Sequence, residues 1–511
     1  MKINKLIVAG AAAAMMAVPA TMKGDDPKFM RSSIYTILVN SDEQNTRLDQ
    51  EAQETDAEGY AATLQESGLS SLGGIPKSVF PTLAIPEQFN DHNLEWRVLD
   101  FDQVTAGMTD DEAKAARPKG KGGSATGKAL LGAAVGGLTG ANTSTMIRYE
   151  KVDDYIFAAV EKFLGEHKIA DNMVAKWYNY NPEGTPKFNP GLIMERGLEN
   201  ASAIDLAQAN VNDDAKAMLS AQGFELINNT FVVAINLRFR NNKALAKEIS
   251  EMVGGAASAA GSNFGALGGL AALGAKKAAE AATNALMKDM YSVTAITNLY
   301  KLHWNDDIDM ALSDKVLYNE NATLQDLLDA GLCHLTYVGQ TKARSGVKKD
   351  KTKTLDQLAS SATARAIDKA LAKLQVENEV FRTVVPISSC SDGFIYAKIG
   401  SKEGLTPGDE YEILEQQQDP KTQKISYKKV GSAKVEKGGV WFNTTGADEL
   451  IANAEEKEAE EMKAAQDLNY SKLKCGKKND FSGYYLRLAK KKAKSRIKSL
   501  RRRSDSAPTS A

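Results

Sequence analysis

The chain carries two kinds of hydrophobic pattern, one typical of strands and one typical of helices. Runs rich in β-branched and aromatic residues predict strands at 32–39, 94–101, 231–239 and 293–304. A different pattern, with Ile156, Val160 and Phe163 near one face, predicts an amphipathic helix over 152–164. Apolar residues at spacings of three and four predict a long helix over 354–376.

The pattern changes after Val380, where short strands alternate with turns. Strands are expected at 394–399, 410–414, 425–430 and 433–435. Turn residues separate the first strands, at 400–404 and again at 406–409. Such a run of short strands predicts a small SH3-like β-barrel.

Two segments interrupt the strand and helix pattern because Gly, Ala, Ser and Leu make up almost all of them. Both contain glycines four residues apart, in a GxxxGxxxG spacing: Gly132, Gly136 and Gly140 in the first, and Gly261, Gly265 and Gly269 in the second. In a helix this spacing places the glycines on one face, where another backbone can approach closely. Helix association in or on a membrane is one interpretation, and a flexible insertion is the other, since Gly weakens helices.

These patterns together predict an α+β or α/β domain over residues 21–345. The two Gly/Ala-rich insertions fall within it, near 120–141 and 253–283. A connecting amphipathic helix over 346–378, the β-barrel over 379–447, and an acidic helix with a helical, basic tail over 448–511 complete the expected layout.

The N-terminus has the pattern of a signal peptide. Lys2 and Lys5 precede an apolar run from Leu6 to Val18, and the small residues before Thr21 suit a cleavage site after residue 20. The run is too short for a permanent spanning helix, which needs about 20 residues. An uncleaved N-terminal anchor is the alternative. We expect an exported protein that is located in the periplasm or is associated with the outer membrane, with the cell surface as a further alternative.

The formal net charge of −1 conceals an asymmetry between the body of the chain and its C-terminus. Residues 487–511 carry +9, and residues 21–486 carry −12. The basic tail includes Lys490, Lys491, Lys492, Arg501, Arg502 and Arg503. Such a tail can bind anions of a membrane surface or an anionic glycan, or it can be attracted to the acidic body. Export makes nucleic acid the least suitable partner, and we expect none.

An aromatic cluster, formed by Trp177, Tyr178, Tyr180 and Phe188, falls in a proline-containing loop over 177–190. Aromatic rings on a rigid loop can stack on a sugar or hold a partner. The other interpretation is that the rings pin the loop to its own domain.

No recognisable catalytic motif occurs in the chain, and we expect no catalytic residue, cofactor or metal. The segment Gly122–Lys128 fits the first part of a phosphate-binding loop, but Ala129 stands where the magnesium-binding hydroxyl belongs. The cluster after His303 starts like a calcium loop, yet Met310 replaces the required glycine. A helix cap at Asp306 or Asp307 explains that cluster better. The three cysteines, one of them necessarily unpaired, are no disulfide scaffold.

Two regions resemble known families of the bacterial cell envelope. Residues 156–164, the run LIMERGL over 192–198 and the helix-to-strand run 215–239 resemble the α/β domain of curli-secretion-type lipoproteins. The stretch 396–430 resembles the C-terminal domain of flagellar assembly protein T, which is similar in pairing such an α/β domain with a barrel. The lipidated Cys of the lipoproteins is missing here. The resemblance implies a non-catalytic assembly role.

The leading functional hypothesis is a non-enzymatic envelope protein that associates with itself or with other envelope proteins and supports a surface or secretion assembly. The alternative is a carbohydrate- or cell-wall-binding module, or a hydrolase, that uses the aromatic loop over 177–190.

Overall fold

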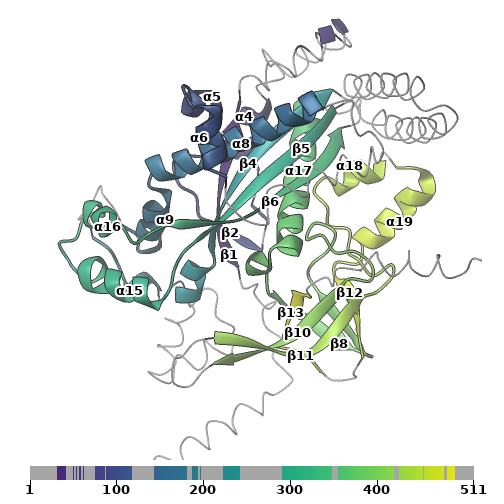
Figure 1. Cartoon of the computed structure of the whole chain (residues 1–511). Helices are drawn as coiled ribbons and strands as arrows, with labels where there is room; N and C mark the ends of the chain where they lie inside the picture. The colour runs from purple at the N-terminus through teal and green to yellow at the C-terminus, as the bar shows by residue number, and fades with distance from the viewer. Residues whose placement is uncertain are drawn as a thin grey trace, which may run out of the picture.

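The computed structural model describes most of the two folded regions expected from the sequence. The described residues are 31–41, 75–117, 143–180, 187–193, 223–241, 291–347, 355–418, 425–476 and 480–489, except 84, 87 and 453, together with Arg196 and a few positions between 50 and 61. The fold is mixed α+β and contains two sheets (Figure 1).

The first sheet has six strands and mixed pairing. Its strands are β2 (Phe89–Asp91), β1 (Ser32–Asn40), β4 (Thr230–Asn241), β5 (Tyr291–Leu302) and β6 (Leu335–Val347) in that order, with β3 (Val98–Asp100) also paired to β1. Strand β1 is parallel to β2, β3 and β4, whereas β5 and β6 join antiparallel to β4 and to each other. All nine residues of β1 are buried, as expected of a strand with neighbours on both edges and helices on both faces.

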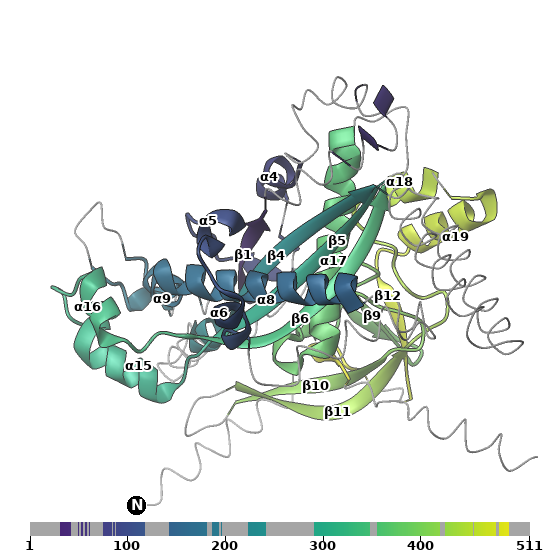
Figure 2. The same cartoon turned by 45° about the horizontal axis from the view of Figure 1, so that its top comes forward.

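Helices cover both faces of this sheet, which makes three layers (Figure 2). On one face, α17 (Leu355–Glu377) and α4 (Ile75–Val79) pack against alternate residues of β4, such as Phe231 and Val233. On the other face, α8 (Thr143–Glu166) and α9 (Ile169–Trp177) pack against Val232 and Ala234. Successive side chains of a strand point to opposite faces. The short run of β4 from Phe231 to Ala234 therefore contributes residues to both cores.

Short helices surround one end of the sheet and close a third core. They are α15 (Asp306–Leu312), the π-helical turn η3 (Ser313–Leu317) and α16 (Leu324–Ala330). The Asn305 side chain accepts a hydrogen bond from the Ile308 backbone N–H and caps α15. The sequence predicted a cap at Asp306 or Asp307, and the cap is the residue just before them. Thr323 and Asp326 form a capping box at the start of α16.

The remaining short elements of this region lie against the helices of both faces. They are η2 (Phe80–Thr82), α5 (Phe101–Thr105), α6 (Asp110–Ala115) and, after α17, η4 (Glu379–Phe381). Of these, α5 and α6 contact α8, and η4 contacts α17. Phe381 is fully buried and stacks on Phe89 with ring centroids 5.2 Å apart. The chain segment that leaves α17 is therefore fixed to the first sheet before the second sheet begins.

The second sheet is antiparallel and curls into a half-barrel. Its seven strands run in the order β7 (Val385–Pro386), β13 (Tyr485–Leu488), β10 (Glu410–Gln418), β11 (Ile425–Val435), β12 (Ser471–Cys475), β9 (Phe394–Ala397) and β8 (Ser389–Ser391). Its concave side holds a core of its own, which includes Ile395, Ile413, Leu473 and Leu486. We refer to it as the curled sheet.

Two helices connect the curled sheet to the three-layer region. They are α18 (Ala447–Ala452) and α19 (Glu456–Gln466), and α18 lies beside α17. Arg365 of α17 forms an ion pair with Glu449 of α18, with 3.5 Å between Nη2 and Oε1. The Thr445 hydroxyl donates a 2.5 Å hydrogen bond to the Asp368 carboxylate of α17. Both contacts involve mostly buried polar groups.

The structure confirms several expected elements and changes others. The predicted helix over 354–376 is α17, and the predicted strand over 231–239 is part of β4. Within the predicted strand over 94–101, only Val98–Asp100 is a strand. The curled sheet gains β12 and β13 from residues that the sequence pattern assigned to the acidic helix and basic tail. None of the three cysteines, Cys333, Cys390 and Cys475, forms a disulfide bond.

Candidate functional site

The aromatic loop predicted as a ligand site belongs largely to the protein interior. Trp177, Tyr178 and Phe188 are buried in the core beside α15 and α16, and Tyr180 packs against Phe188 with ring centroids 4.9 Å apart. The Trp177 indole N–H donates to the Thr230 hydroxyl at 3.0 Å. These rings pin the loop to its own domain, and three of the four present no face to solvent.

Two carboxyl groups with altered acidity lie in the same core. Burial raises the pKa of the Asp171 carboxyl to about 6, and Asp171 shares a hydrogen bond with the Cys333 thiol. Burial also raises the pKa of Asp309 to about 6, and its carboxylate accepts a 3.5 Å hydrogen bond from the Tyr178 hydroxyl. Raised acid pKa values are frequent at functional sites, so the surroundings of the two carboxyl groups decide their role. Their partners are core residues, which favours a structural role.

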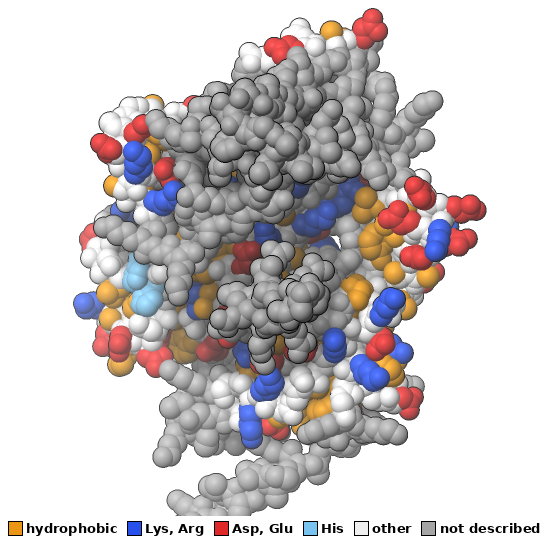
Figure 3. Space-filling view, turned by 45° about the vertical axis from the view of Figure 1, so that its right-hand side comes forward, with side chains coloured by type: hydrophobic (Ala, Val, Ile, Leu, Met, Phe, Trp, Pro, Cys, Tyr) orange, Lys and Arg blue, Asp and Glu red, His pale blue; other side chains and the backbone are white. Residues whose placement is uncertain are grey.

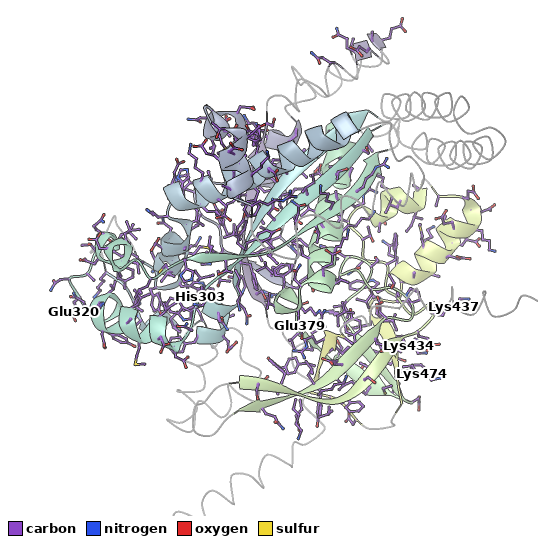
Figure 4. All side chains as sticks on the ribbon, in the orientation of Figure 1. His303, Glu320, Glu379, Lys434, Lys437 and Lys474 are labelled. Atoms are coloured by element: carbon purple, nitrogen blue, oxygen red, sulfur yellow. The ribbon has the colours of Figure 1, made fainter. Side chains whose placement is uncertain are left out.

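The histidines divide into a buried one and an exposed pair. His92 is buried against Trp177, and its Nε2 lies 3.1 Å from the Met173 carbonyl oxygen. His303 and His334 are exposed and stack with ring centroids 4.5 Å apart near α15 (Figure 4 labels His303). Across the described ranges, no group of three or more His, Cys, Asp or Glu side chains is arranged to hold a metal ion.

Most of the other predicted site residues lie outside the described residues. These are the glycines of both GxxxGxxxG segments (Gly132, Gly136, Gly140, Gly261, Gly265 and Gly269) and the tail residues Lys490, Lys491, Lys492, Arg501, Arg502 and Arg503. The first tail residues, Arg487 and Leu488, belong to β13, where Arg487 pairs with Glu412 at 3.0 Å. Among the helices that the structure does describe, none has the length and apolar character to span a membrane.

The convex side of the curled sheet presents a cluster of lysines beside aromatic rings. Lys472 and Lys474 alternate with the buried Leu473 and Cys475 along β12, so both point away from the core. Lys434 of β11 lies directly opposite Lys474 in the antiparallel register. On the other side of β12, Phe394 is opposite Lys474 and Tyr396 is opposite Lys472.

A turn adds a further lysine to this surface. The chain leaving β11 turns at Glu436–Gly439, where Gly438 has a φ of +75°, a conformation that favours glycine. Gly439 lies so close to β12 that a Cβ there would be 3.0 Å from the Lys472 carbonyl oxygen. Backbone hydrogen bonds of 3.0 and 2.7 Å tie the turn to Lys472. The turn places Lys437 beside Lys472.

We call Lys434, Lys437, Lys472 and Lys474, with Phe394 and Tyr396, the basic face. Figure 4 shows the labelled Lys434, Lys437 and Lys474 on the same side of the curled sheet. Figure 3, which turns this side forward, shows blue Lys and Arg side chains interspersed with hydrophobic ones on the lower part of the surface.

A hollow of about 460 Å³ opens within the basic face. It is lined by Tyr396, Glu436, Lys437, Gly438, Gly439, Leu468, Tyr470 and Lys472. Leu468, in the segment that follows α19, is 41% exposed, an unusual position for a large apolar side chain. The hollow thus combines apolar and aromatic walls with two ammonium groups and one carboxylate, a combination typical of small-molecule sites.

The charges of the basic face are poorly neutralised by the protein itself. Within the described residues, none of its four lysines forms an ion pair, although Glu410 lies opposite Lys434 on β10 and Glu436 lines the hollow. The Lys472 ammonium lies 4.0 Å from the centre of the Phe394 ring, in a cation–π contact. Like charges directly opposite on neighbouring strands destabilise a sheet. The arrangement is therefore ready to bind an anion.

The sequence pattern did not single out the basic face. Its lysines come from β11, β12 and the turn between β11 and α18, and its rings come from β9. The hollow adds the ring of Tyr470 from the segment after α19. The alternation of Lys with apolar residues at 471–475 was the available signal, because such alternation is typical of a half-buried strand. Comparison of the chain with models of known protein families and with curated proteins finds no match.

Proposed function

We propose that this chain is a non-enzymatic protein of the cell envelope that supports an assembly and attaches to an anionic envelope polymer through its basic face. The observation that carries the attachment is the lysine pair Lys434 and Lys474. They lie opposite each other on paired strands, and within the described residues neither has a carboxylate within ion-pair distance. An anion that binds across the two strands relieves their mutual repulsion, because its charge is shared by both ammonium groups.

The envelope location rests on the signal-peptide pattern of residues 1–20 and on the resemblance to envelope families. In this proposal the three-layer region corresponds to the α/β domain of curli-secretion-type lipoproteins. The curled sheet corresponds to an SH3-like barrel of the kind found at the C-terminus of flagellar assembly protein T. The mixed α+β fold and the curled antiparallel sheet are compatible with this pairing. The partners in the assembly are further copies of this chain or other envelope proteins.

Sedimentation with isolated cell envelopes tests the attachment. We expect the mature protein to co-sediment at low salt and to be released as the salt concentration rises, because exposed charges are screened. The charge reversal Lys434→Glu with Lys474→Glu should lower the bound fraction at least tenfold. The control, Lys428→Glu with Lys457→Glu, makes the same change in net charge at exposed lysines away from the basic face. Equal loss in both double variants would refute a specific attachment surface.

Crosslinking in fractionated native envelopes tests the assembly. We expect the protein in the envelope fraction, crosslinked to itself or to a small set of envelope proteins. Recovery of the uncrosslinked protein in the cytoplasmic fraction would contradict the proposal.

A further inference from the structure

The hollow in the basic face is lined by charged, aromatic and apolar side chains. Together they restrict the class of ligand that fits more than the positive charge does by itself. Lys437 and Lys472 supply positive charge, Tyr396 and Tyr470 supply ring faces and hydroxyl groups, and Leu468 supplies an exposed apolar surface. A bare phosphate would use the lysines and leave the rings and Leu468 in contact with water.

Glu436 further restricts the class of ligand that fits the hollow. Glu436 lines the same hollow as the two lysines, and an ionised carboxylate can only accept hydrogen bonds. A ligand that carries negative charge over its whole surface would be repelled by this group. A ligand with one anionic group and several hydroxyls suits it, because the hydroxyls can donate to Glu436 while the anionic group faces the lysines.

The ring faces have a matching role. The axial C–H groups of a sugar ring form an apolar patch that packs on an aromatic face, whose π-system carries partial negative charge. Tyr396 is held in the middle of β9, opposite Lys472, so a ring and an ammonium group lie side by side on neighbouring strands. The volume of about 460 Å³ lies within the usual range of small-ligand sites.

We propose that the hollow binds one acidic sugar residue, carrying a carboxylate or a phosphate, within an envelope polysaccharide. In this site Lys437 and Lys472 bind the acidic group, Tyr396 and Tyr470 pack against the sugar ring, and Glu436 accepts hydrogen bonds from its hydroxyls. The inference rests on the proposed function, because it names the chemistry of the anionic polymer to which the basic face attaches.

The turn at Glu436–Gly439 makes the site rigid before any ligand binds. Its backbone is hydrogen-bonded to Lys472 through Glu436 N–H and through the Gly439 carbonyl oxygen, and a Cβ on Gly439 would make a tight contact of 3.0 Å with the Lys472 carbonyl oxygen. Ordering a mobile loop would cost conformational entropy, and a preformed turn avoids that cost. The short sequence Glu436-Lys437-Gly438-Gly439 therefore serves both the fold and the site.

Saturation-transfer NMR with the full mature protein tests the ligand class. The probes are D-glucuronate, glucose 6-phosphate, glucose and inorganic phosphate, and a ten-residue thymidine oligonucleotide serves as a competitor. We expect saturation of the sugar C–H protons of both acidic sugars, and binding of glucose and of phosphate at least tenfold weaker. Displacement of the acidic sugars by the oligonucleotide at lower concentration than by the sugars themselves would overturn the proposal in favour of nucleic acid.

Three variants separate this inference from the proposed function. Tyr396→Leu and Lys437→Gln should each weaken binding of the acidic sugars at least tenfold, and Lys437 is an exposed turn residue whose replacement leaves the core intact. Lys434→Gln, on the basic face but outside the hollow, should leave sugar binding within twofold while it lowers co-sedimentation with envelopes. If envelopes still bind through Lys434 and Lys474 but no acidic sugar binds, the sugar site is refuted and the attachment stands.

Discussion

Arg365 and Glu449 form an ion pair that is almost completely shielded from water, with side chains only 3% and 4% exposed. The Arg365 guanidinium also donates to the carbonyl oxygens of Ser361 and Gly346. The pair joins α17, which covers the first sheet, to α18, which belongs to the second folded region. The contact between the two regions therefore depends on charge as well as on apolar packing.

Replacing Glu449 by Gln should destabilise the protein strongly. The variant leaves Arg365 charged, buried and without its carboxylate, and removal of one member of a buried pair typically costs about 3 to 5 kcal/mol. Urea unfolding followed by circular dichroism measures the loss. The exposed pair Lys162–Glu166 on α8 is the control. Glu166→Gln should change the free energy of unfolding by less than about 0.5 kcal/mol. Equal effects of the two variants would show that the buried pair contributes no more than a surface one.

His92 should make the protein less stable in acid. Burial, with the positive charges of Lys176 and Arg196 nearby, lowers the pKa of the His92 imidazole from 6.5 to about 3. Between these two pH values His92 is neutral in the folded protein and protonated in the unfolded chain. The folded state then loses up to about 1.4 kcal/mol of stability per pH unit between these values. In His92→Gln this loss disappears, and urea midpoints at pH 7, 5.5 and 4 should show the variant gaining on the wild type. A constant difference would contradict the assignment.

Asp171 should have the opposite pH dependence. Burial raises the pKa of its carboxyl from 3.8 to about 6, so the folded protein retains a proton that the unfolded chain has already lost. Its favourable contribution is complete below pH 3.8 and is lost as the pH rises through about 6. Asp171→Asn cannot titrate, so its stability relative to the wild type should rise between pH 4 and pH 7. Thermal unfolding at both pH values measures this, and a fall over that range would refute the buried-acid explanation.

Gly400 should tolerate no side chain. It forms a bridge with Trp441, and a Cβ at this position would lie 2.3 Å from the Trp441 carbonyl oxygen. Gly400→Ala therefore forces two backbone segments apart, which typically costs about 1 to 3 kcal/mol. The matched control is Gly476→Ala, since a Cβ there meets nothing within 4 Å. Differential scanning calorimetry should show a lower melting temperature for the first variant alone.

The core of the fold could be predicted from local pattern. The run SSIYTILVN around Ile34 and Val39 can be buried on both faces, and it forms a central strand. The alanine-rich stripe of α17, which includes Ala362 and Ala366, predicted the long helix that packs on one face of the sheet. In these segments propensity and periodicity agree with tertiary packing, which is why the sequence was sufficient.

The candidate site could not be predicted in the same way, because it depends on long-range pairing. Lys434 and Lys474 are neighbours only because β11 pairs with β12, although α18 and α19 separate the two strands in the sequence. The aromatic loop illustrates the reverse problem. Trp177 and Phe188 had the composition of a ligand platform, and their burial depends on α15 and α16, more than a hundred residues further along the chain.

The parallel pairing of β1 with β4 has a consequence for the order of folding. Val39 and Asn236, linked by a side-chain hydrogen bond, are separated by 197 positions in the chain. At synthesis rates of roughly 5 to 20 residues per second, the inner edge of β1 waits about 10 to 40 seconds for its neighbour. Contacts of such high sequence separation form slowly. The first sheet therefore stays incomplete until β4 has been synthesised.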